Sequence, residues 1–423
     1  MFRLLCTLVP AIIFCLSLSG NADAQWTQQA SGVNDNLYGV HLISPQTGFA
    51  VGWGSSSGAQ VLRTLNGGES WTHSILSYGA FVFSVTFTDD QHGYAAGCLN
   101  GGQAGAVFKT ANGGDSWTYS SMSATYGLYD VEFATPELGF ACGWLGKIYR
   151  TTNGGASWSS VSSGTGNVLR WMSIPTETTG YIVGGTNWDN PNRLYRSTNG
   201  GNSWSSVHTF SGAVIGGVHF FNDSCGVVSG GGGGSFIRKT TDSGDSWDTV
   251  YSGSGMFQFI SFDDSGIGYA CGNSGRVVRS EDYGDSWEEL DTVTPLTTLL
   301  GVSGIEDAVC TVGTSGRIFR DQSGESVGQQ GADGWPGDFR LGQNFPNPFN
   351  PVTTIEFELP VAQKATLTVY NLQGEVVGTP ITDYYQAGSH QMMFDGSSLT
   401  SGLYIYRLTA DASTVSRKMM LIR

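Results

Sequence analysis

One short phrase, written six times, constrains the fold of this chain more than any other feature. Its copies are RTLNGGESW, KTANGGDSW, RTTNGGASW, RSTNGGNSW, KTTDSGDSW and RSEDYGDSW. The tryptophans that end them lie 46, 41, 46, 43 and 40 residues apart. A period of this length indicates an array of repeated structural units rather than one irregular domain.

The phrase has the chemistry of a tight turn between two strands. Its Asn or Asp carries an oxygen that can accept turn amides, and its Gly tolerates the positive φ that such turns need. The Trp then opens the next strand, where its ring can be buried and its N–H can find an acceptor. We therefore assign a structural role to Asn66, Gly68, Trp71, Asn112, Gly114, Trp117, Asn153, Gly155, Trp158, Asn199, Gly201, Trp204, Asp242, Gly244, Trp247, Asp282, Gly284 and Trp287.

The phrase also carries a family resemblance. It resembles the Asp-box, or bacterial neuraminidase (BNR) repeat, of sialidases, sortilin-type receptors and several glycosidases, in which it is a structural hairpin away from the binding face. A second signature precedes the turns, as GFAVGWG, GYAAGCL, GFACGWLGKIYRT, GYIVGG and GYACGNSGRVVRS. Together they resemble the photosystem II assembly/stability factor family, a single seven-bladed propeller. The resemblance implies the fold and leaves the function open, because this scaffold serves unrelated tasks.

Each repeat is predicted to hold four strands, as in a propeller blade. In the first repeat these are, from innermost to outermost, residues 37–43, 48–53, 61–64 and 70–75. Residues 296–326 hold the inner strands of a seventh repeat without a Trp-containing strand after them, whereas residues 25–29 have the pattern of an outermost strand. We therefore predict an all-β, seven-bladed propeller over residues 25–328, closed by its N-terminal strand so that no edge stays open.

The composition changes after Ser326, and residues 329–338 are predicted to be a Gly-rich linker. Residues 339–423 show short strands between Pro and Gly turns, which predicts a small immunoglobulin-like β-sandwich. NFPNPFNP, LTVYN, SGLY and the basic last strand resemble a type A sorting domain of type IX secretion. The sorting-signal residues carried over from it are Asn347, Pro348, Gly402, Tyr404, Lys418 and Arg423. An ordinary fibronectin-like domain, the alternative, would not require a basic strand at the chain's end.

The first residues have the pattern of an export signal. Arg3 precedes an apolar run over 4–18, and Ala22-Asp23-Ala24 fits a cleavage site before Gln25. The run is too short to span a membrane, and we predict a signal peptide over residues 1–24 and no transmembrane segment in the mature chain. With the sorting domain, this predicts transit through the periplasm, recognition by the type IX machinery, and a secreted or outer-membrane surface protein.

Charge and cysteine usage exclude several classes of function. A net charge of −15 and a pI near 4.7 argue against nucleic acids and anionic membranes as partners. Two of the seven cysteines lie in the signal peptide, and the other five fall one per repeat without C-x-x-C spacing. We expect these five to be buried small side chains rather than disulfides or metal ligands. No cofactor and no metal site are predicted, and we expect a monomer.

Binding residues should lie where the repeat breaks. The breaks fall in loops between second and third strands and between blades, which share one face in this strand order. Exposed aromatic residues on loops favour recognition, and simple loop packing is the alternative. The predicted ligand-binding face comprises Trp53, Tyr126, Trp144, Arg170, Trp171, Trp188 and Asp189. The Lys or Arg before each turn recurs in every copy and is predicted to be structural.

Polar residues also share one position on the predicted innermost strands. They are His41, Thr86, Glu132, Ser173, His219 and Ser261, with Asp130 two residues before Glu132. A solvated channel lining is the simplest interpretation. A metal site built from His41 and His219 would require two distant blades to meet.

We predict a non-enzymatic binding propeller for a protein or glycan ligand. One alternative is an exo-glycosidase of sialidase or xyloglucanase type, which would need converging arginines with a Tyr nucleophile, or two carboxylates about 5–10 Å apart. Its acidic candidates Asp130, Glu132 and Asp189 include no obvious pair on neighbouring blades. A second alternative is an assembly factor of the photosystem II type, although a photosynthetic role fits poorly with export.

Overall fold

The computed structural model divides the chain into two compact units, Met1–Ser326 and Val327–Arg423. It describes residues 26–321 and 340–421, apart from 54–57, 78–79, 100, 123–126, 187–190, 264, 291, 306–307, 343, 345–348, 360, 372–375, 378–380, 401 and 411–412. Among these residues, no helix combines the length and the apolar character that crossing a bilayer requires.

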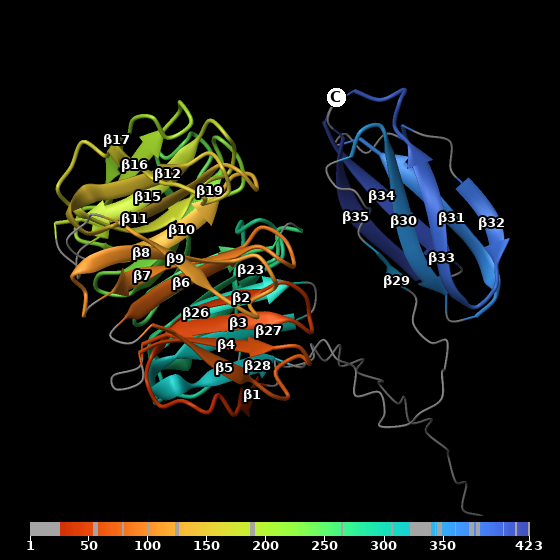
Figure 1. Ribbon diagram of the computed structural model, residues 1–423. Helices are drawn as coiled ribbons and strands as arrows, with labels where there is room; N and C mark the ends of the chain where they lie inside the picture. Colours follow the sequence, from red (N-terminus) through yellow and green to blue (C-terminus); the bar gives the residue numbers. More distant parts are fainter. Residues whose placement is uncertain are drawn as a thin grey trace, which may run out of the picture. The chain divides into compact units, whose positions relative to one another are not determined.

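The first unit is a ring of seven antiparallel four-stranded sheets (Figure 1). From the innermost strand outward, the first three blades are β2 (Leu37–Leu42), β3 (Gly48–Gly52), β4 (Ala59–Thr64), β5 (Thr72–Ser77); β6 (Phe81–Phe87), β7 (Gly93–Leu99), β8 (Ala104–Thr110), β9 (Thr118–Ser121); and β10 (Leu128–Phe133), β11 (Gly139–Gly143), β12 (Lys147–Thr151), β13 (Ser159–Ser162). The next three are β14 (Val168–Ser173), β15 (Gly180–Gly185), β16 (Pro191–Ser197), β17 (Ser205–Thr209); β18 (Val214–Phe220), β19 (Gly226–Gly231), β20 (Ser235–Thr240), β21 (Asp248–Gly253); and β22 (Phe257–Phe262), β23 (Gly268–Gly272), β24 (Val277–Ser280), β25 (Glu288–Glu289). Short 3-10 turns η1 (Trp144–Gly146), η2 (Asn273–Gly275) and η3 (Thr314–Gly316) join second to third strands in the third, sixth and seventh blades.

The seventh blade is completed from the other end of the unit. It consists of β26 (Leu299–Ile305), β27 (Ala308–Gly313), β28 (Ile318–Asp321) and, outermost, β1 (Trp26–Gln29). Trp26 pairs with Asp321 and Gln29 with Ile318. Innermost strands contact each other from blade to blade around the ring, including β26 and β2. The predicted seven-bladed fold and its closure by the N-terminal strand are thus confirmed.

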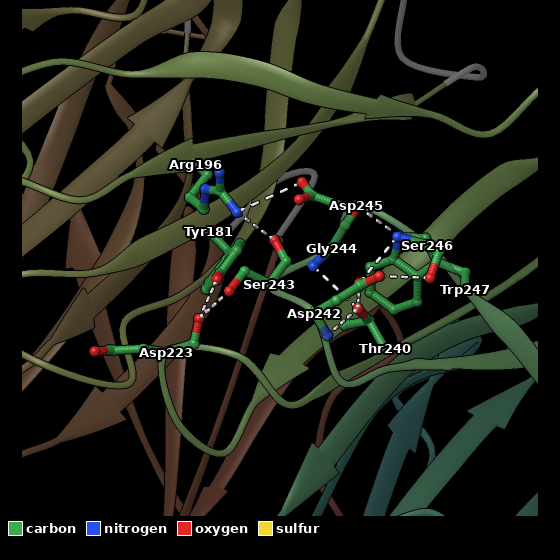
Figure 2. A network of polar contacts seen from close by, with 10 residues as sticks. All are labelled: Tyr181, Arg196, Asp223, Thr240, Asp242, Ser243, Gly244, Asp245, Ser246 and Trp247. Carbon is green, nitrogen blue, oxygen red and sulfur yellow. Dashed lines mark hydrogen bonds and ion pairs between the residues drawn. The ribbon is translucent and has the colours of Figure 1, made fainter.

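Each of the six repeated phrases forms a turn, and all six turns share the same pattern of hydrogen bonds. In the fifth blade, Thr240 Oγ1 donates to Asp242 Oδ1 at 2.8 Å and accepts the Gly244 N–H at 3.0 Å (Figure 2). Asp242 Oδ1 also accepts the Ser246 N–H at 2.9 Å. These bonds, chiefly from Ser246, lower the pKa of Asp242 to about 2. The same three bonds recur in the turns that follow Thr64, Thr110, Thr151, Ser197 and Ser280.

The cation before most of the turns connects neighbouring blades. Arg196 Nη1 donates to the Ser243 carbonyl of the next blade at 2.9 Å and lies 3.6 Å from Asp245 (Figure 2). Equivalent links join Arg63 to Asp115, Lys109 to Gly154, Arg150 to Gly200, Lys239 to Asp285 and Arg320 to Pro45. Arg279 Nε donates to the Tyr269 hydroxyl at 3.2 Å, and Arg279 pairs with Glu281, both in its own blade. The repeated cations therefore hold the perimeter of the ring together.

The C-terminal unit is a β-sandwich. One sheet has the order β29 (Arg340–Leu341), β30 (Val352–Leu359), β33 (Gly388–Asp395), and the other β32 (Ile381–Tyr385), β31 (Gln363–Tyr370), β34 (Gly402–Ala410), β35 (Ser413–Leu421). Buried side chains of both sheets, such as Ile355 and Leu408, form one core. The buried Tyr406 hydroxyl donates to the Gly342 carbonyl at 2.7 Å and accepts the Asn344 N–H at 2.9 Å.

The cysteines behave as small core residues. Cys98, Cys142, Cys271 and Cys310 are buried, Cys225 is half-buried, and all five are free thiols.

Candidate binding site

Every innermost strand of the propeller carries a β-bulge close to its start. In β2 the register shifts between Leu37 and Gly39, so that Tyr38 is the extra residue. The residues bulged in chain order are Tyr38, Phe83, Tyr129, Arg170, Gly216, Gln258 and Leu300. A bulge leaves one residue outside the ladder and can re-aim its side chain.

The bulged side chains meet at one cavity. Six of the seven line a space of about 240 Å³, together with Asn36, Trp171 and Thr314. At the seventh position, Gly216, a β-carbon would lie 2.0 Å from the carbonyl oxygen of Phe257. Since six different blades contribute to one lining, the cavity lies on the propeller axis, at the end where the innermost strands begin.

The wall of the cavity is aromatic across the first three blades. The ring centroids of Tyr38 and Phe83 lie 5.5 Å apart, and those of Phe83 and Tyr129 lie 4.9 Å apart. Burial raises the pKa of the Tyr129 hydroxyl far above its usual value, so this group stays neutral at physiological pH. The three side chains form a continuous aromatic surface.

The fourth and sixth blades supply polar groups. The Arg170 guanidinium lies 5.6 Å from the ring centroid of Trp171, which packs edge-to-face on Phe259 at 5.0 Å. Trp171 is only 6% exposed, and its Nε1 has no hydrogen-bond partner among the described residues. Gln258 Nε2 donates to Asn273 Oδ1 at 3.1 Å. Arg170 is the one formally charged side chain among the nine that line the cavity.

Further along the innermost strands, polar side chains tie several pairs of neighbouring blades together. Asp130 Oδ2 accepts the Met172 N–H at 2.8 Å, and Ser173 Oγ accepts the Phe220 N–H at 2.8 Å. Ser261 donates to the Val302 carbonyl at 2.9 Å. These bonds satisfy backbone groups at the inner edges of the sheets, which would otherwise lack partners.

Burial shifts the pKa values of the histidines and carboxyl groups on the innermost strands. Burial lowers the pKa of both His41 and His219 to about 4; His41 stacks on Phe87, and His219 lies near Phe262. Burial raises the pKa of Asp130 to about 7, and burial and then the Asp130 charge raise that of Glu132. No cluster of three or more His, Cys, Asp or Glu side chains able to hold a metal occurs among the residues described.

The structure places some of the residues predicted for the binding face at the cavity and others elsewhere. Trp53 is 36% exposed, with its ring 5.1 Å from that of Phe81. Trp144 is half-buried rather than exposed, because it lies 6.3 Å from the Tyr129 ring. Arg170 and Trp171 both line the cavity. Tyr126, Trp188 and Asp189 lie outside the described residues.

Sequence reasoning missed most of the cavity. The predicted site residues do not include Tyr38, Phe83, Tyr129, Gln258 and Leu300, because that prediction rests on breaks of the repeat in loops and these residues lie on strands. A signal was present in the strands themselves. The second or third residue of the innermost strand is aromatic in the first three blades and is then cationic, glycine, amide and aliphatic in the next four.

The C-terminal residues match a known family. Residues 343–422 match the family model described as "Secretion system C-terminal sorting domain". The C-terminal module is a secretion-system sorting domain. It implies secretion to the cell surface or beyond. Of the predicted sorting residues, Gly402 opens β34, the buried Tyr404 donates to the Thr400 carbonyl at 2.7 Å, and Lys418 pairs with Ile405. Asn347, Pro348 and Arg423 lie outside the described residues.

The propeller resembles solved structures at low sequence identity. "YCF48 bound to D1 peptide" is 17% identical over 70% of this chain and 96% of that chain, with a TM-score of 0.55. YCF48 from Cyanidioschyzon merolae is 19% identical over 70% and 98%, with a TM-score of 0.55. The GH74 xyloglucanase from Xanthomonas campestris is 14% identical over 78% and 59%, with a TM-score of 0.55. At these identities the likeness establishes the fold alone. No curated protein sequence matches the chain.

Proposed function

We propose that the propeller is a non-enzymatic binding module, exported through its sorting domain, whose ligand enters the axial cavity. One observation carries this proposal. The residues that repeat hold the blades together, whereas the bulged residues, which differ between blades, line one common cavity. A cavity lined by apolar rings and a few polar groups is typical of ligand sites.

The main alternative is glycoside hydrolysis, which is motivated by the structural similarity to the GH74 xyloglucanase. Such chemistry requires a pair of carboxyl groups across the scissile bond. None of the nine residues that line the cavity is Asp or Glu. Asp130 and Glu132 lie on a single strand, and Asp130 is engaged by backbone amides. The lining therefore supports binding better than hydrolysis.

A peptide-binding assembly factor is the second alternative, motivated by the YCF48 structures. A peptide-binding assembly factor would use the same cavity as a glycan-binding protein. The two functions differ only in the ligand that the cavity holds. The test below therefore presents both kinds of ligand.

The mature chain, residues 25–423, should be tested on glycan and surface-protein arrays. We expect capture to weaken at least tenfold in a Tyr38→Ala/Gln258→Ala variant, which removes two cavity side chains. The matched control is Gln46→Ala/Tyr119→Ala, since both of these side chains are exposed and lie outside the cavity. Unchanged capture by the cavity variant would reject the site. Cleavage of a captured glycan that disappears in Glu132→Gln would favour the glycosidase.

A further inference from the structure

Two adjacent residues of β14 face the same cavity. On a regular strand Arg170 and Trp171 would point to opposite faces, but the bulge between Leu169 and Trp171 brings both into the lining. The guanidinium presents a fork of N–H donors that fits a carboxylate. The neighbouring Trp171 completes this side of the lining, with its ring centroid 5.6 Å from the guanidinium. This side of the cavity is therefore suited to a carboxylate.

The aromatic wall selects a different part of the ligand. Tyr38, Phe83 and Tyr129 come from blades one to three, whereas Arg170 comes from blade four. The faces of aromatic rings carry negative charge, so they attract the C–H-rich face of a sugar ring. A ligand that satisfies both parts has an anionic group at one edge and a flat, apolar face.

The neutral polar side chains in the lining favour a sugar over an apolar amino-acid side chain as the ligand. Asn36, Gln258 and Thr314 also line the cavity, and an apolar ligand would remove them from water without offering new partners, which is unfavourable. The hydroxyl groups of a sugar would pair with them. The volume of about 240 Å³ is below the roughly 300–1,000 Å³ typical of drug-sized ligands, so it suits one sugar residue.

We propose that the axial cavity binds a hexuronic acid, a pyranose ring that carries a carboxylate, either free or at the end of an acidic polysaccharide. The carboxylate lies at Arg170, and the ring packs against the aromatic wall. This inference rests on the proposed function of the cavity as a binding site.

Calorimetric titration of the mature chain tests this directly. The probes are D-galacturonic and D-glucuronic acid, their neutral counterparts D-galactose and D-glucose, a uronic-acid disaccharide, and N-acetylphenylalanine, which places a carboxylate beside an apolar ring. We expect at least one uronic acid to bind with a dissociation constant of about 1 mM or tighter, and its neutral counterpart at least ~10-fold more weakly. Tighter binding of the disaccharide would identify the polysaccharide end as the source.

Variants separate the carboxylate contact from general damage. Arg170→Gln should weaken uronic acid binding about 10–100-fold and leave neutral sugars unchanged. The matched control is Arg193→Gln, an exposed residue of the same blade outside the lining. Thermal unfolding checks that each variant is folded.

Two results would overturn the inference in distinguishable ways. If N-acetylphenylalanine binds more tightly than both uronic acids and depends on Arg170, the cavity remains a binding site and the sugar class is wrong. If no uronic acid binds and array capture is also insensitive to Tyr38→Ala/Gln258→Ala, both this inference and the proposed function fail.

Discussion

Substitution of Gln29 tests how the ring is closed. Gln29 is 9% exposed and lies at the end of β1, where its Nε2 donates to the Gly67 carbonyl at 3.3 Å. Its Oε1 accepts the indole N–H of Trp71 at 2.9 Å. The amide therefore joins the last blade to the first turn of the first blade. Gln28, the preceding residue of the same strand, is exposed.

The expected loss follows from these two bonds. Gln29→Ala leaves a buried carbonyl and a half-buried indole N–H without their partner, and each such group costs about 1–3 kcal/mol, less where water can replace the partner. We therefore expect the free energy of unfolding to fall by about 2–3 kcal/mol. At roughly 2 °C per kcal/mol for a unit of this size, Tm should fall by roughly 4–6 °C. Gln28→Ala should change Tm by less than about 1 °C.

Tryptophan fluorescence is the appropriate assay. Eleven of the twelve tryptophans lie in the propeller, one (Trp335) lies in the predicted linker, and none lies between residues 340 and 423, so the fluorescence change reports chiefly on the propeller. Equal midpoints for Gln29→Ala and Gln28→Ala in thermal and urea unfolding would refute the reasoning that the buried amide connects the two ends of the ring.

Three further predictions concern the perimeter, the channel and export. Lys239 donates to the Tyr283 carbonyl at 2.9 Å and Asp285 at 2.7 Å, so Lys239→Met should lower the free energy of unfolding by about 1–3 kcal/mol; an unchanged urea midpoint would contradict this. The raised pKa of Glu132 means that the folded chain keeps this proton to higher pH than the unfolded chain. Its stabilising effect is therefore complete below about pH 4 and lost as pH rises. Relative to Glu132→Gln, the wild type should become less stable from pH 4 upward in urea titrations, and a constant difference would contradict the burial of this carboxyl. Deletion of residues 340–423 should retain the propeller in the periplasm of a type IX secreting host, as measured by cell fractionation, and undiminished secretion would show that the sorting domain is dispensable.

The architecture was predictable because its determinants are local and repeated. Thr, Asn or Asp, Gly and Ser at fixed spacing specify the turn that Thr240 and Asp242 form. The missing outer strand of the seventh repeat and the surplus strand at Trp26 together specified the closure. Each of these inferences needed only the pattern of one repeat compared with the next.

The binding site was less predictable because it depends on pairing between strands. An innermost strand read alone places Arg170 and Trp171 on opposite faces, and only the bulge against β15 brings both into the cavity. The sequence predicts an exposed Trp144 because it places this residue in a loop where the repeat breaks. In η1, however, Leu145 adopts a left-handed conformation, with φ of 55°, and is 47% exposed, whereas Trp144 turns toward Tyr129.

Hydrogen–deuterium exchange of residues 25–423, with and without a ligand captured on the arrays, tests the central claim most directly. Ligand in the axial cavity should slow amide exchange in residues 36–39, 83–84, 168–172 and 257–259, where the bulged strands begin, and leave the turns at Asn66 and Asp242 unchanged. Protection confined to those turns, or to the sorting domain, would contradict the account.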